Sequence, residues 1–459
     1  MDRLGRTVAR GSAGGALVRR DPGLVRNLLA GQNSDGLLRR VREDDGAVRC
    51  VLCGVCARAC PVSAITVARP TGGAMARGAA GEDTSFVVDE PRCIGCGSCV
   101  SVCRLGALVP GEQLGHRAAY WQSLAERPAR LKSGHGLCSG CAAPIVVRQV
   151  LSQVEGHYVA SVATGCLEVS TTIYPHTSWD GSFIHTAFEN AAATLSGVES
   201  AYRALKRRGR LRDDVAFIAF GGDGGTYDIG LQALSGAVER GHRMLYVCYD
   251  NGAYMNTGFQ RSGATPFGAW TSTTPAGAGS PGKTVDRKPI TEIMLGHRMP
   301  YVAQASPHDP ADLMGKAAKA LATDGPSFLN ILSPCPRGWR TGGAETIDLA
   351  RQATETCVWP LFEAIDGRTR LTYRPARKQP VREWLCRQGR FAHLFEPGCE
   401  GVLDQIQAQV DDEWSRLLER CGDPLKSPGE TSLAAGRDGT QAEWRQVPEC
   451  GVAGARQSE

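Results

Sequence analysis

The sequence predicts an α/β protein whose main domain holds a parallel sheet, with a smaller α+β domain in front of it. Two observations carry this prediction. From residue 134 onward, short apolar runs rich in β-branched residues alternate with helical patterns, which is typical of parallel sheets with helices on both faces. Between residues 46 and 112, cysteines recur at tight, regular spacing, which indicates a small domain built around bound metal.

Composition excludes several classes of protein. The chain has 459 residues, enough for two to four domains, and its net charge of +5 is too balanced to favour nucleic acid or an acidic membrane surface. It has no run of 18 apolar residues and no long apolar region at its start, so we expect a cytoplasmic protein. Its 18 cysteines, many in Cys-x-x-Cys pairs, favour metal over disulfides.

The small domain carries two runs with the spacing of bacterial two-cluster ferredoxins, in which four thiolates hold each 4Fe–4S cluster. The fourth cysteine of each run usually crosses to the other cluster. We therefore expect one cluster on Cys50, Cys53, Cys56 and Cys103, and the other on Cys93, Cys96, Cys99 and Cys60. Two zinc sites are the competing interpretation, but zinc does not need three close cysteines plus a crossing fourth.

The main domain is organised around residues 215–260. An apolar strand, Val215 to Phe220, leads into a Gly-rich turn, then a helical pattern from Asp228 to Arg240, and then a second strand from Met244 to Tyr249. In parallel sheets ligands bind at the carboxyl ends of strands, so both turns should face one crevice.

The chemistry of the two turns suits a magnesium diphosphate. Asp223 offers a carboxylate, Asn251 an amide oxygen and Ala253 a backbone carbonyl, which are the hard ligands that Mg²⁺ prefers. Glycines in the first turn let the backbone approach phosphates; they are Gly222, Gly224 and Gly225. The pattern in which Gly-Asp-Gly is followed, after 25 residues, by Asp-Asn resembles the thiamine diphosphate signature. A lone Gly-Asp-Gly, by contrast, is more often a tight turn.

Four further cysteines form a candidate third cluster site. Cys166 follows a strand from Tyr158 to Ala163, and Cys335 follows a strand from Ser327 to Leu332. Both should lie at the sheet edge that holds the thiamine turns, together with the pair Cys138 and Cys141. From the residues alone, buried structural cysteines are an equal alternative.

These features suggest a division of the chain into six parts. An N-terminal extension (1–45) precedes the two-cluster domain (46–112) and a linker (113–133). The thiamine domain (134–345) is followed by a C-terminal segment that packs on it (346–421) and a polar, disordered tail (422–459).

From about Gly134 to His393 the chain resembles the beta subunit of pyruvate:ferredoxin oxidoreductases, in the wider 2-oxoacid:acceptor oxidoreductase family. The stretches that carry the resemblance are ATGCLEVSTT, HTAFENAAA, GGDGGTYDIGLQALSGA, YDNGAYMNTGFQRSGATPFGAWT and SPCPRGWR. The two-cluster domain resembles the delta subunit of the same enzymes, fused in front.

The resemblance implies cofactors and site residues. Cys138, Cys141, Cys166 and Cys335 match the ligands of the cluster next to thiamine, which makes three 4Fe–4S clusters in all and brings Cys166 beside the cofactor. Asp223, Asn251 and Ala253 match the Mg²⁺ ligands, and Gly222 to Gly225 match the diphosphate loop. Asn256 matches an asparagine near the reacting carbon, which gives it a catalytic role; otherwise it is a turn residue.

The sequence departs from the family pattern at two places. Ala142-Ala143 stand where Gly-Glu is usual after the second cysteine, and Gly252 stands where a glutamate is usual. One thiamine contact is therefore missing or replaced, and substrate choice is open to change.

The resemblance implies that a 2-oxoacid, coenzyme A and oxidised ferredoxin become acyl-CoA, CO₂ and reduced ferredoxin. Pyruvate is the first choice of substrate, followed by branched-chain 2-oxoacids, and then oxalate or an aryl 2-oxoacid. The carboxylate that activates thiamine belongs to the alpha subunit in this family, so we expect alpha-type and gamma-type partner subunits and a free ferredoxin. Two other classes remain open: a non-redox thiamine decarboxylase or carboligase, and a non-enzymatic electron-transfer subunit.

Overall fold

The computed structural model divides the chain into two compact units, Met1–Pro128 and Ala129–Glu459. The residues that the structure describes are 38–41, 49–60, 64–67, 86–88, 93, 95–111, 122–277, 280–375 and 377–422. The expected helix between Leu24 and Leu38, the Gly/Ala-rich loop at 71–81 and the tail from 423 onward lie outside them, apart from Leu38 itself.

The smaller unit is built from two similar halves. Each half has a short helix that follows a left-handed glycine: α3 (Val55–Ala59) follows Gly54 and α4 (Ser98–Ser101) follows Gly97, both at φ 73°. Two antiparallel strand pairs complete the unit: β1 (Leu38–Arg40) with β4 (Leu108–Pro110), and β2 (Ile65–Val67) with β3 (Phe86–Val88). Because β1 pairs with β4, this unit begins before residue 46, inside the segment expected to be an extension.

The larger unit contains an eight-stranded sheet of order β14-β13-β11-β12-β8-β7-β5-β6. The six strands from β11 to β6 are parallel, as the alternation of strands and helices predicts. They are β5 (His157–Ala163), β6 (Ser182–Thr186), β7 (Val215–Gly222), β8 (Leu245–Asp250), β11 (Tyr301–Ala305) and β12 (Ser327–Leu332). The strand expected at Ser327 to Leu332 has the same bounds in the structure.

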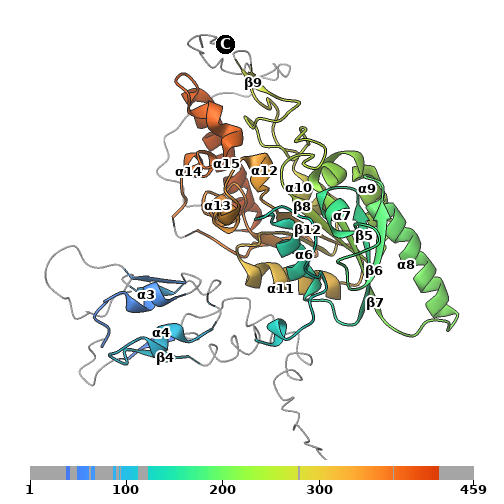
Figure 1. The fold of residues 1–459 in the computed structure, drawn as a ribbon, viewed down its shortest axis with the longest axis horizontal. Helices are drawn as coiled ribbons and strands as arrows, with labels where there is room; N and C mark the ends of the chain where they lie inside the picture. The colour runs from blue at the N-terminus through green and yellow to red at the C-terminus, as the bar shows by residue number, and fades with distance from the viewer. Residues whose placement is uncertain are drawn as a thin grey trace, which may run out of the picture. The chain divides into compact units, whose positions relative to one another are not determined.

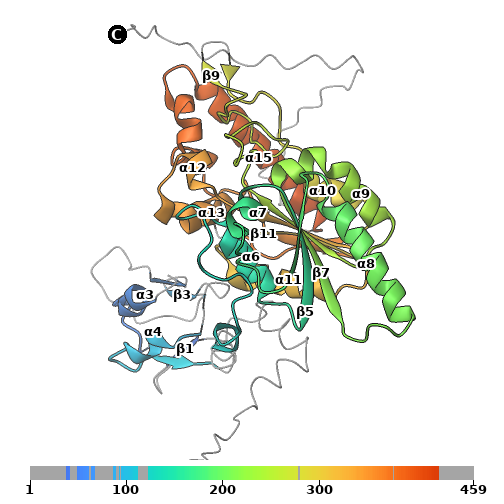
Figure 2. The same ribbon diagram turned by 45° about the vertical axis from the view of Figure 1, so that its right-hand side comes forward.

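Helices cover both faces of this sheet (Figures 1 and 2). On one face lie α6 (Ala143–Leu151) and α11 (Pro310–Ala322), whose apolar side chains join one buried cluster. On the other lie α8 (Ala191–Arg207), α9 (Leu231–Glu239) and α10 (Ile290–Gly296), which join another. Both faces are apolar, so the strands read as continuous apolar runs rather than alternating ones.

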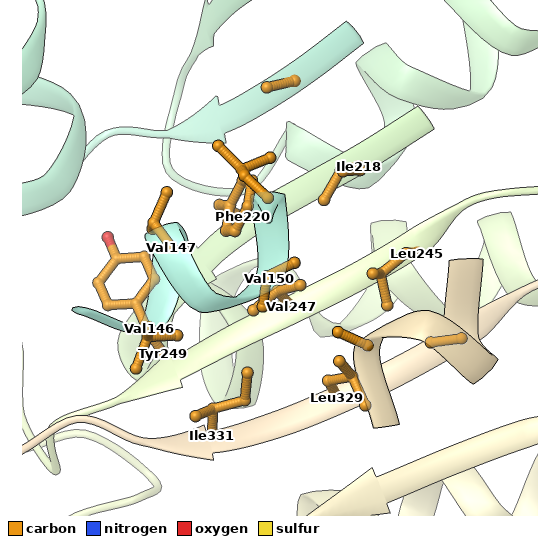
Figure 3. Close-up of a cluster of buried hydrophobic side chains, with 14 of the residues drawn as sticks. Val146, Val147, Val150, Ile218, Phe220, Leu245, Val247, Tyr249, Leu329 and Ile331 are labelled. Carbon is orange, nitrogen blue, oxygen red and sulfur yellow. The ribbon is translucent and has the colours of Figure 1, made fainter. Parts of the chain in front are cut away.

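Side chains of alternate residues in each strand point to opposite faces of the sheet. Ile218 and Phe220 of β7 point to the α6 side with Leu245 and Val247 of β8, as Figure 3 shows. Phe217 and Ala219 belong to the opposite cluster. This period of two decides which helix layer each side chain meets, so a slip of one residue would bury the wrong side chains on each face and the register is strongly specified.

The C-terminal segment packs on the sheet and also extends it with two further strands. Strands β13 (Phe362–Ile365) and β14 (Arg368–Leu371) add to β11 in antiparallel order. The helices of this segment are α13 (Thr346–Glu355), α14 (Val381–Leu385) and α15 (Glu400–Arg420), preceded by the short α12 (Pro336–Trp339); between α14 and α15 lies the 3₁₀ helix η3 (Gly389–Phe395). They share a third buried cluster rich in tryptophan. The helix expected from Gly401 to Leu418 is α15.

No helix among the described residues is both long enough and apolar enough to cross a membrane.

A buried carboxylate ties the added strands to the parallel sheet. Glu363 of β13 is fully buried, and it accepts hydrogen bonds from Tyr301 Oη of β11 at 2.6 Å and Lys319 Nζ of α11 at 2.9 Å. Arg370 Nε of β14 donates to it at 2.7 Å. Although burial alone would raise it, these donors and charges lower the pKa of Glu363 to about 2.

We predict that Glu363→Gln lowers the free energy of unfolding by about 2 to 3 kcal/mol at pH 7. This is below the usual cost of breaking a buried pair because Lys319 and Arg370 are partly exposed and return to water. Since the folded pKa is depressed, the contribution is complete above the unfolded pKa and is lost as pH falls from there towards about 2. The difference between wild type and variant should therefore be smaller by about 0.8 kcal/mol at pH 4 than at pH 7. Urea denaturation at both pH values measures it, and an unchanged difference would contradict this account.

Candidate functional site

The candidate site lies along the carboxyl ends of four neighbouring strands. In the order β12-β8-β7-β5, these strands are adjacent and parallel. Cys335 follows β12, Asn251 follows β8, Asp223 follows β7 and Cys166 follows β5 at a short interval. The register places Gly222 beside Tyr249 and Asp250 beside Leu332, so the strand ends lie level. The sheet thus brings together residues that are up to 169 positions apart, from 166 to 335.

Asp223, Asn251 and Ala253 form a cluster of oxygen atoms. One atom of the Asn251 side-chain amide lies 2.9 Å from Asp223 Oδ1 and 2.8 Å from the carbonyl oxygen of Ala253. With its nitrogen in that position the amide donates to both acceptors. With its oxygen there, three oxygen atoms converge, which is the ligand chemistry of a hard cation. All three residues are buried.

The electrostatic environment of Asp223 suits a bound cation, because a cation would stabilise the ionised form of this buried carboxyl group. Burial, followed by the neighbouring Asp250 carboxylate, raises the pKa of Asp223 to about 8. Its hydrogen-bond donors are Ser262 Oγ at 2.5 Å and the Asn251 backbone N–H at 3.3 Å. Asp250, by contrast, is occupied by a salt bridge to Arg287 and by the Tyr227 hydroxyl at 2.5 Å. A buried carboxylate without a cationic side chain of its own is suited to hold a metal ion.

Ser262 is a site residue that the sequence did not single out. It is fully buried and belongs to the long loop that follows the second turn. A serine 39 positions from its partner fits no short motif, so no local signal could have identified it.

The Gly-rich turn allows close approach of backbone and side chains. A Cβ atom on Gly224 would lie 2.2 Å from Tyr254 Cε1, and one on Gly221 would lie 2.4 Å from Tyr246 Oη. The helix after the turn begins with a π-helical segment, η1 (Gly224–Ile229), and becomes α-helical only at α9. The expected helix start at Asp228 is therefore wrong by several residues. Single π turns inside helices often occur at functional sites.

Asn256, the expected catalytic residue, is exposed and lies in a turn that the Gly258 N–H closes on the Met255 carbonyl at 3.3 Å. It follows β8 in the same segment as Asn251 and Ala253. Its side chain is therefore accessible.

The four cysteines of the candidate third cluster lie close enough to interact electrostatically. Burial, then Cys335, Cys166 and Cys138, raise the pKa of Cys141 to about 12. Burial, then Cys335 and Cys138, raise that of Cys166 to about 11. The thiols are thus hard to ionise unless a positively charged group holds them, as iron does in a cluster. The Gly338 N–H donates to Cys335 Sγ at 3.4 Å. The Ala142 N–H, next to Cys141, donates to the carbonyl of Pro334, next to Cys335, at 3.3 Å and so links the two cysteine segments.

The eight cysteines of the small unit follow its internal repeat. Cys60 Sγ accepts the Ala64 N–H at 3.2 Å, and Cys103 Sγ accepts the Ala107 N–H at 3.3 Å. Cys56 and Cys99 are buried in the core of the unit. Burial, then Cys93 and Cys96, raise the pKa of Cys99 to about 11. Burial, then Cys50 and Cys53, raise the pKa of Cys56 in the same way.

Within the described ranges, no three His, Cys, Asp or Glu side chains converge tightly enough to hold a single metal ion. Each thiolate of a four-iron cluster binds a different iron atom, so a cluster site spreads its sulfur atoms more widely than a zinc site does. The electrostatic coupling within two groups of cysteines is compatible with that wider spacing: the set Cys138, Cys141, Cys166 and Cys335, and the first three cysteines of each run in the small unit.

The two departures in the sequence have structural counterparts. Ala142 and Ala143 are buried at the start of α6 and bring no carboxylate to the edge of the sheet. Gly252 adopts φ 79°, and a Cβ atom there would lie 3.0 Å from Arg390 Nη1. Arg390 therefore lies against the turn at the place where a side chain at position 252 would begin.

Two domain families match the sequence. A family described as thiamine pyrophosphate enzyme, C-terminal TPP binding domain, matches residues 163–331, and a 4Fe-4S dicluster domain matches residues 49–107. The chain therefore combines a thiamine-diphosphate-binding α/β domain with an iron–sulfur domain in front of it. This combination defines the class of protein.

Similar proteins narrow the class further. The chain is 51% identical over 304 residues to pyruvate synthase subunit PorB of Thermotoga maritima, covering 65% of this chain and 94% of that protein. It is 51% identical over 286 residues to PorB of Methanocaldococcus jannaschii, covering 62% and 95%. Ketoisovalerate oxidoreductase subunit VorB of Pyrococcus abyssi is 40% identical over 287 residues, covering 62% and 91%. The chain belongs to this family of 2-oxoacid oxidoreductase subunits, and the expected resemblance is confirmed.

We predict that Gly224→Ala weakens binding of thiamine diphosphate by about tenfold or more, because the new methyl group displaces the Tyr254 ring from the turn. Calorimetric titration of the purified chain with thiamine diphosphate and Mg²⁺ measures the change. Gly197→Ala is the matched control, since a Cβ atom on Gly197 in α8 meets nothing within 4 Å. Equal affinity in both variants would show that the turn does not approach the cofactor.

Proposed function

We propose that the chain is the thiamine- and cluster-carrying subunit of a 2-oxoacid:ferredoxin oxidoreductase that oxidatively decarboxylates pyruvate and forms acetyl-CoA. The observation that carries the proposal is the alignment of the Asp223, Asn251 and Ala253 oxygens with Cys166 and Cys335 on one edge of the sheet. It puts a diphosphate-binding turn beside a set of four thiols.

Each part of the turn has a defined task in this proposal. Asp223, Asn251 and Ala253 supply oxygen ligands to Mg²⁺, and Ser262 holds the Asp223 carboxylate in place through a 2.5 Å hydrogen bond. The backbone of Gly222–Gly225 receives the diphosphate. Bound thiamine diphosphate supplies the carbanion chemistry that permits loss of CO₂ from a 2-oxoacid. Asn256 offers an amide donor to the substrate oxygen.

The cysteines define the route for electrons. We assign one 4Fe–4S cluster to Cys138, Cys141, Cys166 and Cys335, and two more to the paired runs of the small unit, with Cys60 and Cys103 exchanged between them. Clusters on these residues supply one-electron acceptors, so a decarboxylation that would otherwise end in protonation becomes an oxidation. A free ferredoxin takes the electrons from the small unit.

Pyruvate is favoured over other 2-oxoacids because two of the relatives at 51% identity are named pyruvate synthase subunits. Branched-chain 2-oxoacids come second, since a relative at 40% identity is named for ketoisovalerate. The absence of a carboxylate at positions 142, 143 and 252 gives no preference for either. Oxalate and aryl 2-oxoacids have no comparable support.

A non-enzymatic electron-transfer subunit is the second candidate. The raised pKa of Asp223 and the converging oxygens at Asn251 count against it, because a protein scaffold without cofactor gains nothing from a buried carboxylate that has no salt bridge. A non-redox decarboxylase is disfavoured by the match of residues 49–107 to a dicluster domain.

Metal analysis separates these candidates. We predict about twelve iron and twelve acid-labile sulfide per chain after anaerobic purification, against about eight for a carrier and none for a decarboxylase. Cys335→Ser should lower the iron content to about eight, whereas Cys386→Ser, which changes an exposed cysteine outside the sets, should leave it unchanged. Equal iron in the two variants would remove Cys335 from the ligand set.

We further predict that the chain alone does not turn over 2-oxoacids and becomes active with an alpha-type partner that supplies the missing carboxylate for thiamine activation. Anaerobic co-purification with the partner, followed by viologen reduction with coenzyme A and a panel of 2-oxoacids, tests this. The highest kcat/KM should be for pyruvate. Turnover by the isolated chain, or a preference for a branched substrate, would contradict the respective part of the proposal.

A further inference from the structure

A short buried loop, residues 262–265, contacts both turns of the candidate magnesium site. Ser262 Oγ donates a hydrogen bond to Asp223 Oδ2 at 2.5 Å, and Thr265 Oγ1 donates to the carbonyl oxygen of Gly252 at 2.7 Å. The two hydroxyl groups are linked within the loop, because the Ser262 backbone N–H donates to Thr265 Oγ1 at 2.9 Å. The position of this loop therefore sets the position of the Asp223 carboxylate and of the second turn together.

The loop is held in turn by a buried lysine from a later segment of the chain. Lys283 Nζ donates to the carbonyl oxygen atoms of Thr265 at 2.5 Å, Asp286 at 3.3 Å and Gly263 at 3.4 Å. An ammonium group has three N–H donors, so these three carbonyls occupy all of them. Two of the three belong to the loop, and the third belongs to the lysine's own segment. Lys283 thus ties the loop to the segment that follows it.

A neighbouring arginine also reaches the loop, but it has other partners. Arg287 Nη1 donates to the carbonyl oxygen of Ala264 at 3.1 Å. The same guanidinium forms a salt bridge with Asp250 and donates to the Tyr227 hydroxyl at 2.7 Å. Its removal would disturb several places at once. The hydrogen bonds of the Lys283 ammonium group, in contrast, go only to backbone carbonyls of the loop and of its own segment.

The charge of Lys283 does not explain its presence through stability. Burial, followed by repulsion from Arg261 and Arg287, lowers the pKa of Lys283 to about 7. Asp228 and Asp286 act in the opposite direction without restoring the usual value of 10.5. Because the folded pKa lies below the unfolded one, ionisation of this group opposes folding at neutral pH. Its contribution therefore lies in the hydrogen bonds that it makes.

We propose that Lys283 is a positioning residue for Mg²⁺ binding, which acts by fixing the loop whose Ser262 and Thr265 hydroxyls hold the Asp223 carboxylate and the Gly252 carbonyl. The inference rests on the proposed function, in which Asp223 is a ligand of Mg²⁺. Without the ammonium group the Thr265 carbonyl loses this donor and the loop is free to shift. The carboxylate must then be ordered when the metal binds, and that ordering lowers the affinity.

Mg²⁺ affinity tests the proposal. The chain is co-purified anaerobically with its partner and freed of Mg²⁺ and thiamine diphosphate. Calorimetry at saturating thiamine diphosphate then gives the Kd for Mg²⁺. Ser262→Ala should raise this Kd by about tenfold, the lower end of the usual effect for a residue that orients a metal ligand. Lys283→Met, which acts one step further from the metal, should raise it by about threefold to tenfold.

A double variant distinguishes positioning from a general loss of structure. If Lys283 acts through the loop hydroxyls, the combined Ser262→Ala and Lys283→Met variant should raise the Kd by clearly less than the product of the two single effects. A combined effect equal to that product would contradict the proposed route through Ser262.

Lys316→Met is the matched control. Lys316 of α11 is also 1% exposed and also donates to a backbone carbonyl, that of Gln304 at 2.8 Å, but it lies outside the loop. This variant should lower Tm, because Asp312 loses its salt bridge, and should leave the Kd for Mg²⁺ unchanged. Lys283→Gln keeps two N–H donors and should raise the Kd less than Lys283→Met does. It also replaces that variant if the methionine side chain prevents folding.

The outcomes separate this inference from the proposed function. A wild-type complex that binds no Mg²⁺ with thiamine diphosphate would overturn the proposed function, and this inference with it. Tight binding by the wild type, with the same Kd in the Lys283 variants, would overturn the role of Lys283 alone. An equal rise of the Kd in Lys316→Met would also overturn it, because the effect would then follow from lost stability rather than from the loop.

Discussion

The parallel register of four strands is the constraint on which the rest of this structure depends. Hydrogen bonding across β12, β8, β7 and β5 leaves little freedom in how their ends line up, because both faces of each strand are buried against helices. A slip of one residue would exchange the two faces of a strand. The carboxyl edge is therefore a rigid line on which Cys335, Asn251, Asp223 and the Cys166 segment keep fixed order.

Burial at this edge gives the site its electrostatic character. It raises the pKa values of Asp223, Cys141 and Cys166, so each group resists ionisation in the chain alone. A bound cation reverses that preference, which couples cofactor binding to the charge of the site. Arg390, whose guanidinium lies against Gly252, brings a positive charge to the same region, where Cys335, Asp250 and Asp223 act on it as negative groups.

Local patterns were sufficient to predict much of the fold. The β12 strand was predicted with its observed bounds because a fully buried strand is a continuous apolar run, and α15 because its apolar residues repeat at helical spacing. The helix after Asp223 was placed too late, since glycine and a β-branched residue disguise the π-helical start. Strands β13 and β14 were missed as part of the sheet because β13 pairs with β11, whose residues lie some 60 positions away, and β14 joins only through β13. The pairing of β1 with β4 in the small unit likewise joins residues some 70 positions apart.

The sequence by itself determined the chemistry: cysteine runs at ligand spacing, and an acid and an amide at the ends of two apolar strands. These are local properties, because each motif needs only neighbouring residues to supply its donor atoms. Only the tertiary structure decided which donors meet. It directs the Ser262 hydroxyl to donate a hydrogen bond to Asp223 and forms a salt bridge between Asp250 and Arg287. It also brings Arg390 of the C-terminal segment against Gly252. The physical reason is that burial and long-range packing set the charge of each group, and neither can be read from spacing along the chain.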